Sequence, residues 1–173
     1  MVINPSEVSP SVSYQLLTSI IVPRPIAFVS TVSADGIPNL APFSFFNGVC
    51  GEPPTLLFCA ARRVPPKDTL VNIEAIGEFV VNVVTESLAE QMNMASAGFP
   101  PEVDEFAVTG LTPVPSEIVR PSRLRESPVN LECRLTQLVN VSDRPLGAVV
   151  VIGEVVRFHI DDRLLNEIER AHV

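Results

Sequence analysis

A short basic stretch holds the residues whose types and spacing are best suited to chemistry. "RRVPPKDTLVNI", residues 62–73, places two arginines and a lysine around paired prolines, directly before the predicted start of a helix. A helix N-terminus presents unpaired backbone N–H groups and the positive end of the helix dipole, which together favour a bound anion. The stretch therefore predicts a phosphate site, to which a preceding lysine or arginine adds full charge and Thr69 adds a hydroxyl donor. A solvated basic turn, followed by an ordinary helix cap at Asp68 or Thr69, explains the same residues equally well.

A second candidate site lies in "NLAPFSFF", residues 39–46. It follows the β-branched run "IAFVSTVS", residues 26–33, and the turn signal "ADG", so the two segments predict a hairpin. Pro38 and Pro42 cannot donate to a sheet ladder, which predicts an edge strand with free backbone groups. A flat heteroaromatic ring with a polar edge, such as isoalloxazine, needs such backbone groups together with small or apolar contacts. The alternative is that the three phenylalanines of the segment are ordinary core residues.

The elements that must position these two sites follow from hydrophobic periodicity and turn signals. Further strands are expected at residues 55–61, 78–85, 129–136 and 148–160. Helices are expected at residues 68–76, at 87–98 with a capping box of Ser87 and Glu90, and at 161–172 with a cap at Asp161 or Asp162. The proline-rich residues 99–121 predict a long surface loop with one short strand. Strands joined mainly by hairpins, with helices outside them, predict a mainly β fold, an antiparallel barrel, as one domain over residues 1–173.

Two of these strands carry a finer pattern. In the first, four apolar residues alternate with four polar ones: Val129, Leu131, Cys133 and Leu135 with Asn130, Glu132, Arg134 and Thr136. This alternation predicts one buried face and one polar face. The second strand, residues 148–160, contains Gly153, which predicts a bend.

Composition excludes several classes of protein. The chain of 173 residues has a formal net charge of −8, whereas a general nucleic-acid binder needs a basic face to displace counterions. The N-terminal residues lack the cationic and apolar segments of a signal peptide, and no apolar run reaches the length of a membrane span. These features predict a cytoplasmic, soluble protein that binds neither nucleic acid nor membrane.

The three cysteines show no metal or redox pattern. Cys50, Cys59 and Cys133 form no CxxC pair, and His159 and His172 are the sequence's only histidines. Free thiols in a reducing compartment, with Cys59 and Cys133 buried in strands, are the favoured interpretation, and no metal site is expected.

With these motifs in view, the sequence resembles the flavin reductase-like family, whose members fold as an FMN-binding split barrel. The resemblance rests on "PRPIAFVSTVSADGIPNLAPFSFF", on "PPTLLFCAARRVPPKDTLVNIEAIGEFVVNVV" and on "FPPEVDEF", and it extends from Tyr14 to about Ile160. It implies an antiparallel split β-barrel with peripheral helices. It also implies a homodimer with FMN bound near the subunit interface.

The resemblance assigns roles to individual residues. The flavin would be lined by Ser30, Thr31, Asn39, Leu40, Ala41, Pro42, Phe43 and Ser44, and its phosphate end would be held by Arg62, Lys67, Asp68 and Thr69. "FPPEVDEF", residues 99–106, would lie near the substrate side of the flavin and touch the partner subunit. Many members of the family continue beyond the closing helix through a glycine-rich aromatic tail, whereas this sequence ends at Val173.

The residue types available for catalysis agree with flavin chemistry. The sequence contains no GxSxG, HExxH, GxGxxG or GxxxxGK[ST] motif. In a flavin enzyme the cofactor performs hydride and electron transfer, so the protein needs no acid–base pair. His159 is a candidate donor to nicotinamide or to reduced flavin, although a packed or surface role is commoner for a single histidine on a strand. Arg24 is expected to meet a phosphate, a carboxylate or a structural salt-bridge partner.

Three functions are compatible with this sequence. We predict an NAD(P)H-dependent flavin reductase, in which FMN, or alternatively FAD, accepts hydride from NADH or NADPH and passes it to free flavin, oxygen or a partner oxygenase. The second is a flavoredoxin-like carrier whose FMN shuttles electrons to a redox protein. The third is a flavin- or haem-binding module without turnover.

Overall fold

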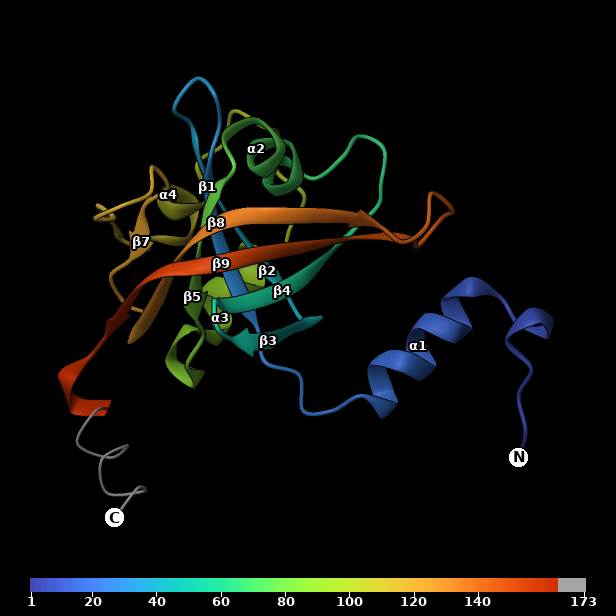
Figure 1. The fold of residues 1–173 in the computed structure, drawn as a ribbon. Coiled ribbons are helices and arrows are strands. Elements are labelled where there is room, and N and C mark those ends of the chain that lie inside the picture. Colours follow the sequence, from blue (N-terminus) through green and yellow to red (C-terminus); the bar gives the residue numbers. More distant parts are fainter. Residues whose placement is uncertain (165–173) are drawn as a thin grey trace, which may run out of the picture.

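The computed structural model describes residues 1–164, and Figure 1 shows the course of the chain. Within these residues the main element is a seven-stranded antiparallel sheet in the order β2-β1-β5-β8-β9-β4-β3. Its strands are β1 (Ala27–Val32), β2 (Pro38–Phe43), β3 (Phe46–Gly51), β4 (Pro54–Ala61), β5 (Glu78–Val83), β8 (Val129–Asn140) and β9 (Ala148–Ile160). A second, two-stranded sheet pairs β6 (Pro113–Val114) with β7 (Arg123–Leu124). The predicted mainly β, antiparallel architecture is confirmed.

Helices and single turns surround the sheet. They are η1 (Pro5–Glu7), α1 (Pro10–Ile20), α2 (Asp68–Ile76), η2 (Glu86–Leu88), α3 (Ala89–Met94) and α4 (Glu105–Thr109). Helix α2 packs against β1 and β2, and α4 packs against β2. Figure 1 shows α1 standing apart from the sheet, and this helix buries none of its residues. No helix among the described residues is long and apolar enough to cross a membrane.

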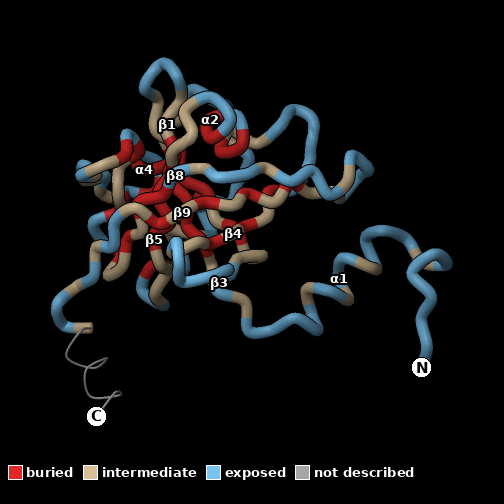
Figure 2. The backbone as a smooth tube through the Cα atoms, in the orientation of Figure 1, coloured by how far each residue is buried: buried red, intermediate tan, exposed pale blue. Residues whose placement is uncertain are grey.

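The hairpin β1–β2 is buried on both of its faces. Ala27 and Val29 belong to the larger apolar cluster, which lies between the strands of the barrel. Phe28 and Leu40 face the other way, into a smaller cluster with Phe106 of α4. Figure 2 shows the resulting buried centre around β1, β5 and β9. Because β2 pairs only with β1, it forms one end of the sheet order, as its two prolines predict.

The predicted N-caps of α2 and α3 are wrong. Helix α2 begins at Asp68 with Lys67 as its N-cap, and no side chain caps it. The capping box of Ser87 and Glu90 does not form, because the chain makes the single turn η2 first and α3 then starts after Leu88. At the start of α3, burial of Leu88 in the smaller apolar cluster overrides the local signal.

Two other expectations are corrected in part. The proline-rich loop contains the expected short strand, but it also contains α4, whose N-cap Asp104 accepts the backbone N–H groups of Phe106 and Ala107. Of the predicted closing helix, only its first residues are described, where the carboxylate of Asp161 accepts the backbone N–H of Arg163. The remainder, residues 165–172, lies outside the described part of the chain.

Strand β8 does not have the predicted fully polar face. Asn130 and Glu132 are as buried as their apolar neighbour Cys133, while Arg134 is exposed. A register shift between Glu132 and Cys133 interrupts the alternation. On the paired strand, a Cβ at Gly153 would lie 2.4 Å from the ring of Phe79, so the glycine permits a close approach of this aromatic side chain.

Candidate flavin site

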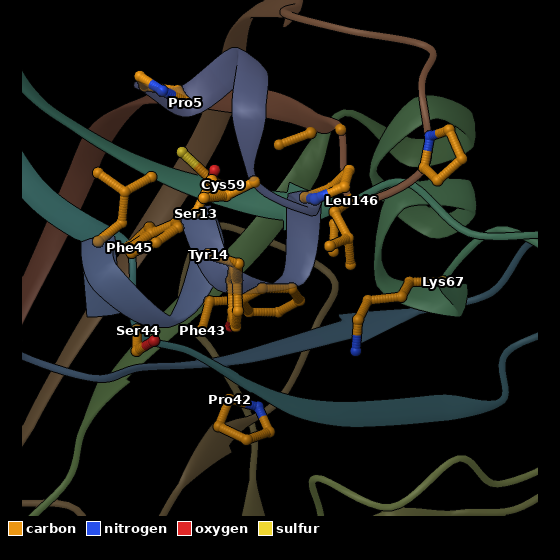
Figure 3. Close-up of a pocket in the computed structure, with 17 residues that line it drawn as sticks. Pro5, Ser13, Tyr14, Pro42, Phe43, Ser44, Phe45, Cys59, Lys67 and Leu146 are labelled. Atoms are coloured by element: carbon orange, nitrogen blue, oxygen red, sulfur yellow. The ribbon is translucent and has the colours of Figure 1, made fainter. Parts of the chain in front are cut away.

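A cavity of about 520 Å³ lies where α1, the end of β2, β4 and the β8–β9 hairpin meet (Figure 3). Aromatic and small apolar side chains dominate its wall, and Lys67 supplies its charge. The lining residues include Tyr14, Pro42, Phe43, Ser44, Phe45, Cys59, Lys67 and Leu146. A cavity of this size is typical of sites for small molecules and cofactors. We call it the flavin cavity, after the ligand that the sequence predicts.

The outer edge of β2 supplies backbone groups to this region. The backbone N–H of Leu40 donates to Glu105 Oε2 at 3.0 Å, so it points away from β1. Because strand residues alternate in direction, Pro38 and Pro42 point outward as well. Both prolines therefore occupy positions at which the pairing with β1 needs no N–H group. Of these positions only Pro42 lines the cavity, so its outward carbonyl group is an acceptor next to the cavity.

A buried hydrogen-bond network fixes this edge to the neighbouring helices. The side chain of Asn39 is its centre: Oδ1 accepts from Thr31 Oγ1 at 3.1 Å and from Thr69 Oγ1 at 2.8 Å. Asn72 of α2 donates to Thr31 Oγ1 at 3.0 Å. On the other side, Asn39 Nδ2 donates to Glu105 Oε1 of α4 at 2.9 Å. The network joins β1, β2, α2 and α4 at one point.

Glu105 is the charged member of this network. Only 5% of it is exposed, and burial raises the pKa of its carboxyl group, while hydrogen bonds from Leu40 and Asn39 partly oppose this rise. The carboxylate binds one donor from the strand backbone and one from a strand side chain. Glu105 therefore holds the edge of β2 in a fixed position.

Lys67 stands at the N-terminus of α2 and faces the cavity. Its ammonium group lies 5.5 Å from the centre of the Phe43 ring, a cation–π distance. Burial and the nearby charge of Arg63 lower the pKa of Lys67. Within residues 1–164, no acceptor binds the backbone N–H groups of Asp68 and Thr69. A cation and two free helix N–H groups are the elements of a phosphate site.

A small recess of about 20 Å³ lies on the other side of Lys67, between α2 and the 95–99 segment. Asn39, Ala41, Asp68 and Glu105 take part in its lining. The recess has room for a single water molecule only. Asp68 and Thr69 line this recess and not the flavin cavity, whereas Lys67 lines both.

The two arginines of the basic stretch point in different directions. Arg62 pairs with Asp143 of the β8–β9 hairpin at 3.0 Å and donates to Asn140 Oδ1 at 3.3 Å. It lies in the lining of neither the flavin cavity nor the small recess. Arg63, by contrast, lines the recess together with Lys67. The sequence pattern alone could not distinguish them, because adjacent residues of an irregular loop have no fixed side-chain direction.

The other predicted flavin-lining residues fall into two groups. Pro42, Phe43 and Ser44 line the flavin cavity, while Asn39 and Ala41 line the recess. Thr69, predicted at the phosphate, also lines the recess and donates to Asn39. The remaining ones are enclosed by protein: Ser30 donates to the carbonyl oxygen of Ser122, Thr31 donates to Asn39, and Leu40 lies in the smaller apolar cluster. Their side chains hold the neighbouring elements in place and do not line the flavin cavity.

His159 lies away from the flavin cavity. It lines a separate, polar pocket near the end of β9, whereas the first residue of the same strand, Ala148, lines the flavin cavity. Eleven residue steps of extended strand separate these positions by roughly 35 Å. The His159 ring bonds Glu132 at 2.6 Å. The structure thus does not bring His159 together with the other predicted site residues of the chain.

Among residues 1–164, Arg24 pairs with no carboxylate. Its guanidinium donates to the carbonyl oxygens of Thr18 and Ile21 near the end of α1, and it lies 6.0 Å from the centre of the Phe45 ring. Tyr14 packs edge-on against the same ring at 6.3 Å. These contacts link α1 to the cavity wall.

Sequence reasoning missed several residues of the site. Tyr14, Cys59 and Leu146 line the cavity, and Glu105 fixes its backbone edge. For Glu105 a signal was present, because an acidic residue next to an apolar one inside a proline-rich loop is unusual for a solvated segment. Leu146 offers no such signal, since its place depends on the turn of the β8–β9 hairpin.

Comparison with known proteins gives this fold and site a family. The chain matches the model of the flavin reductase like domain over residues 19–169. An uncharacterized protein of Aquifex aeolicus is 44% identical over 156 residues, which is 89% of this chain and 78% of that protein. The chain belongs to the flavin reductase-like family.

Two solved structures are similar in sequence as well as in fold. Nitrilotriacetate monooxygenase component B from Bacillus cereus is 36% identical, with a TM-score of 0.90 over 95% of this chain and 83% of that one. The 2-nitrobenzoate 2-nitroreductase NbaA of Pseudomonas fluorescens is 31% identical, with a TM-score of 0.87 over 98% of this chain and 81% of that one. The predicted split-barrel fold is confirmed.

The residues of the cavity fit a flavin mononucleotide. The end of β2 at Pro42 suits the polar rim of an isoalloxazine ring, and Phe43, Phe45 and Tyr14 offer apolar contacts. Lys67 suits the phosphate, and the free N–H groups of Asp68 and Thr69 follow it at the start of α2, where they line the adjacent recess. No carboxylate is among the described residues that line the cavity, so nothing there repels an anion.

Proposed function

We propose that this protein is an NAD(P)H-dependent flavin reductase that binds FMN in the flavin cavity. The observation that carries the proposal is the meeting of the end of strand β2, an aromatic wall and a lysine at a helix N-terminus around one cavity. When bound, the flavin supplies the hydride and electron transfer. The chain's own residues bind it, orient it and shield it from water.

The cavity wall supports a cofactor-based reaction. Among the described lining residues there is no histidine, aspartate or glutamate that could act as a general acid or base. Cys59 is a poor nucleophile, because burial raises the pKa of its thiol. A reaction in this cavity therefore depends on chemistry brought by a ligand.

A more specific part of the proposal concerns the acceptor of the reducing equivalents. The printed name of the Bacillus cereus relative is that of a monooxygenase component, which favours delivery of reduced flavin to a partner oxygenase. The name of the Pseudomonas fluorescens relative is that of a nitroreductase, which favours direct reduction of a small aromatic acceptor as a second candidate. Both alternatives use the same flavin cavity.

We further propose that the protein works as a cytoplasmic homodimer. Its three cysteines are free, which suits a reducing compartment. Helix α1 and the residues after it expose several large apolar side chains, including Leu17, Ile20, Ile21 and Val22. A second copy that covers these side chains would also close the open side of the cavity beside α1.

The experiment is an anaerobic titration of the purified, FMN-loaded protein with NADH and with NADPH, followed by visible absorbance. Rapid bleaching of the flavin band by either donor is the expected result. Retained flavin that stays oxidised with both donors, but accepts electrons from a reduced protein, would instead establish an electron carrier. Failure of the protein to retain or perturb any flavin would overturn the proposal and leave the non-catalytic module.

A further inference from the structure

The polar pocket beside His159 holds cationic side chains that the flavin site does not use. Its volume is about 580 Å³, and it lies where β7, the turn after β7 and the end of β9 meet. The lining residues are Val114, Arg123, Arg125, Ser127, Pro128, Asn130, Phe158, His159, Ile160 and Asp161, and no residue of this list lines the flavin cavity. A cavity of this size admits a small organic molecule. We call it the His159 pocket.

Two arginines of the pocket point to the same side of the chain. Leu124, which lies between them, is fully buried in the smaller apolar cluster, so Arg123 and Arg125 face the opposite way. Arg123 donates from Nε and Nη2 to the carbonyl oxygen of Pro115. Within residues 1–164, the guanidinium group of Arg125 forms neither an ion pair nor a hydrogen bond. The pocket therefore offers a ligand one complete guanidinium group and part of a second.

Buried amide groups hold the backbone beneath these arginines. The backbone N–H of Leu124 donates to Asn82 Oδ1 at 2.9 Å. Asn130 Nδ2 donates to Asn82 Oδ1 at 3.0 Å and to the carbonyl oxygen of Leu124 at 3.1 Å. The backbone N–H of Arg125 donates to the carbonyl oxygen of Thr112 at 3.0 Å. Because this backbone is already ordered, a ligand that binds the arginines does not have to order it.

Two other lining residues have polar atoms without a partner among the described residues. Asn130 is only 4% exposed and donates from its amide nitrogen to protein, but its Oδ1 accepts no hydrogen bond. His159 bonds Glu132 through Nε2 at 2.6 Å, which leaves its Nδ1 without a partner. Buried polar atoms are nearly always hydrogen-bonded, so an unpaired Oδ1 in a pocket wall indicates a place for a ligand.

The remaining wall of the pocket suits the carbon skeleton of an organic anion. Asp161 is the carboxylate among the described lining residues, and the side chain of Arg163 binds both of its oxygens. Its negative charge is therefore balanced next to the pocket. Phe158, which is 54% exposed, and Ile160 add apolar contact area to the same wall.

We propose that the His159 pocket is a second ligand site, which binds a small organic anion: a carboxylate or phosphate group on an apolar body. Arg123 and Arg125 bind the anionic group, because guanidinium matches the oxygens of both anions. The ring of Phe158 packs against the apolar body, and Asn130 accepts a hydrogen bond from a hydroxyl or amino group of the ligand. The site is separate from the flavin cavity, which lies at the other end of β9.

Ligand-observed NMR on the purified full chain tests this site with four probes: benzoate, phenyl phosphate, inorganic phosphate and the neutral benzamide. The wild type is expected to bind benzoate or phenyl phosphate. Benzamide binding by the wild type, and binding of the anion by Arg125→Ala, should each be weaker by about tenfold, the effect of one lost charge-assisted contact. Arg120→Ala is the matched control, because Arg120 is exposed and lies outside the pocket. It should bind the probes as the wild type does.

The probes also distinguish the two anionic groups and the apolar contact. Binding of benzoate alone identifies a carboxylate ligand, and binding of phenyl phosphate alone identifies a phosphate. Phe158→Ala should weaken the binding of either aromatic anion without changing that of inorganic phosphate. Binding of inorganic phosphate alone would contradict an organic ligand.

Three results would overturn the second site. They are the absence of probe binding by the wild type, equal binding by Arg125→Ala and Arg120→Ala, and benzamide binding as tight as that of benzoate and phenyl phosphate. Lys67→Ala separates this site from the flavin cavity. It should bind the probes as the wild type does, and weaker binding by Lys67→Ala would place the probes in the flavin cavity and contradict the proposal.

Discussion

At the residue scale, Lys67 is the positive group of the flavin cavity, and its replacement tests the phosphate site. Lys67→Ala is expected to weaken FMN binding by about 1.5–3 kcal/mol, because a charged hydrogen bond to phosphate is lost. Lys67→Arg keeps the charge and is the matched variant, with a smaller expected loss. The measurement is a flavin titration followed by fluorescence. Unchanged affinity in folded Lys67→Ala would remove this residue from the site.

The pH dependence of binding gives Lys67 a second test. Burial lowers the pKa of its ammonium group, and a bound phosphate favours the charged form and so raises it again. FMN affinity is therefore expected to be complete below the lowered pKa and to fall as the pH rises through it, toward the ordinary value of about 10.4. Lys67→Arg should keep its affinity in this range, since arginine stays charged. Identical profiles for the wild type and Lys67→Arg would contradict this assignment.

Glu105 is expected to act on flavin binding without touching the flavin. Glu105→Ala leaves two buried donors without a partner, the amide of Asn39 and the backbone N–H of Leu40, at about 1–3 kcal/mol for each. We expect lower stability in urea unfolding and weaker FMN binding, because the edge of β2 is no longer fixed. Glu105→Gln keeps part of the network and should lose less. Glu102→Ala, an exposed position in the same loop, is the control.

The sequence shows which residue types are present, but it does not show in which direction their side chains point. Lys67 was predicted to hold the phosphate, and the structure places it in the lining of the flavin cavity, where this role stays a prediction. Arg62 was placed at the phosphate, yet it pairs with Asp143 across a loop that no local pattern describes. Glu105 contacts a strand 65 residues earlier in the chain, so only the tertiary fold reveals its role.

At the scale of elements, strand β8 carries a buried carboxylate that links it to β9 and to the 117–119 segment. Glu132 is fully buried, accepts the backbone N–H groups of Glu117, Ile118 and Val119, and bonds His159 at 2.6 Å. Burial opposes its ionisation, but these hydrogen bonds prevail and lower its pKa. The charged form of Glu132 is therefore the one that stabilises the fold.

This lowered pKa predicts a loss of stability in acid. Since the folded value lies below the unfolded value of about 4.3, the contribution of Glu132 is complete above that pH and is lost as the pH falls through the folded value. Urea unfolding at a series of pH values should show a drop for the wild type that is smaller for Glu132→Gln. Glu154→Gln, on β9, is the control. Equal acid sensitivity of the wild type and Glu132→Gln would contradict the role given to this carboxylate.

Some of the elements were predicted correctly and others were not, and each outcome has a physical reason. Hairpin β1–β2 was found because a β-branched run, a turn signal and two prolines agree. The caps of α2 and α3 were missed because α2 begins after Lys67 and α3 begins after the buried Leu88. Neither residue is a typical cap. The buried polar residues of β8 were missed because period-two reasoning assigns polar residues to solvent, and the covering loop is remote in sequence.

At the scale of the whole molecule, the exposed apolar side chains of α1 predict self-association. Light scattering on the purified protein is expected to give twice the chain mass of 18.7 kDa. Ile20→Glu should shift the protein toward the monomer, because Ile20 is 72% exposed in the single chain and a buried charge without a partner is costly. Val71→Glu, on the exposed face of α2, should not. A monomeric wild type would contradict the proposed dimer.

The fold class followed from the sequence because strands, turns and prolines indicated the same antiparallel arrangement. The order of strands did not, since β8 and β9 separate β5 from β4, and such long-range pairing has no local signature. The cavity depends on this order: its wall combines α1, β2, β4 and the β8–β9 hairpin, which are distant in the chain.

A crystal structure of the protein with FMN would test the proposed flavin site without an intermediate assumption. We predict that the isoalloxazine ring lies along the edge of β2 at Pro42–Ser44, with its phosphate within hydrogen-bond distance of Lys67 Nζ and of the backbone N–H of Asp68 or Thr69. Flavin bound elsewhere, for example in the polar pocket beside His159, or a phosphate remote from the N-terminus of α2, would contradict the proposed site.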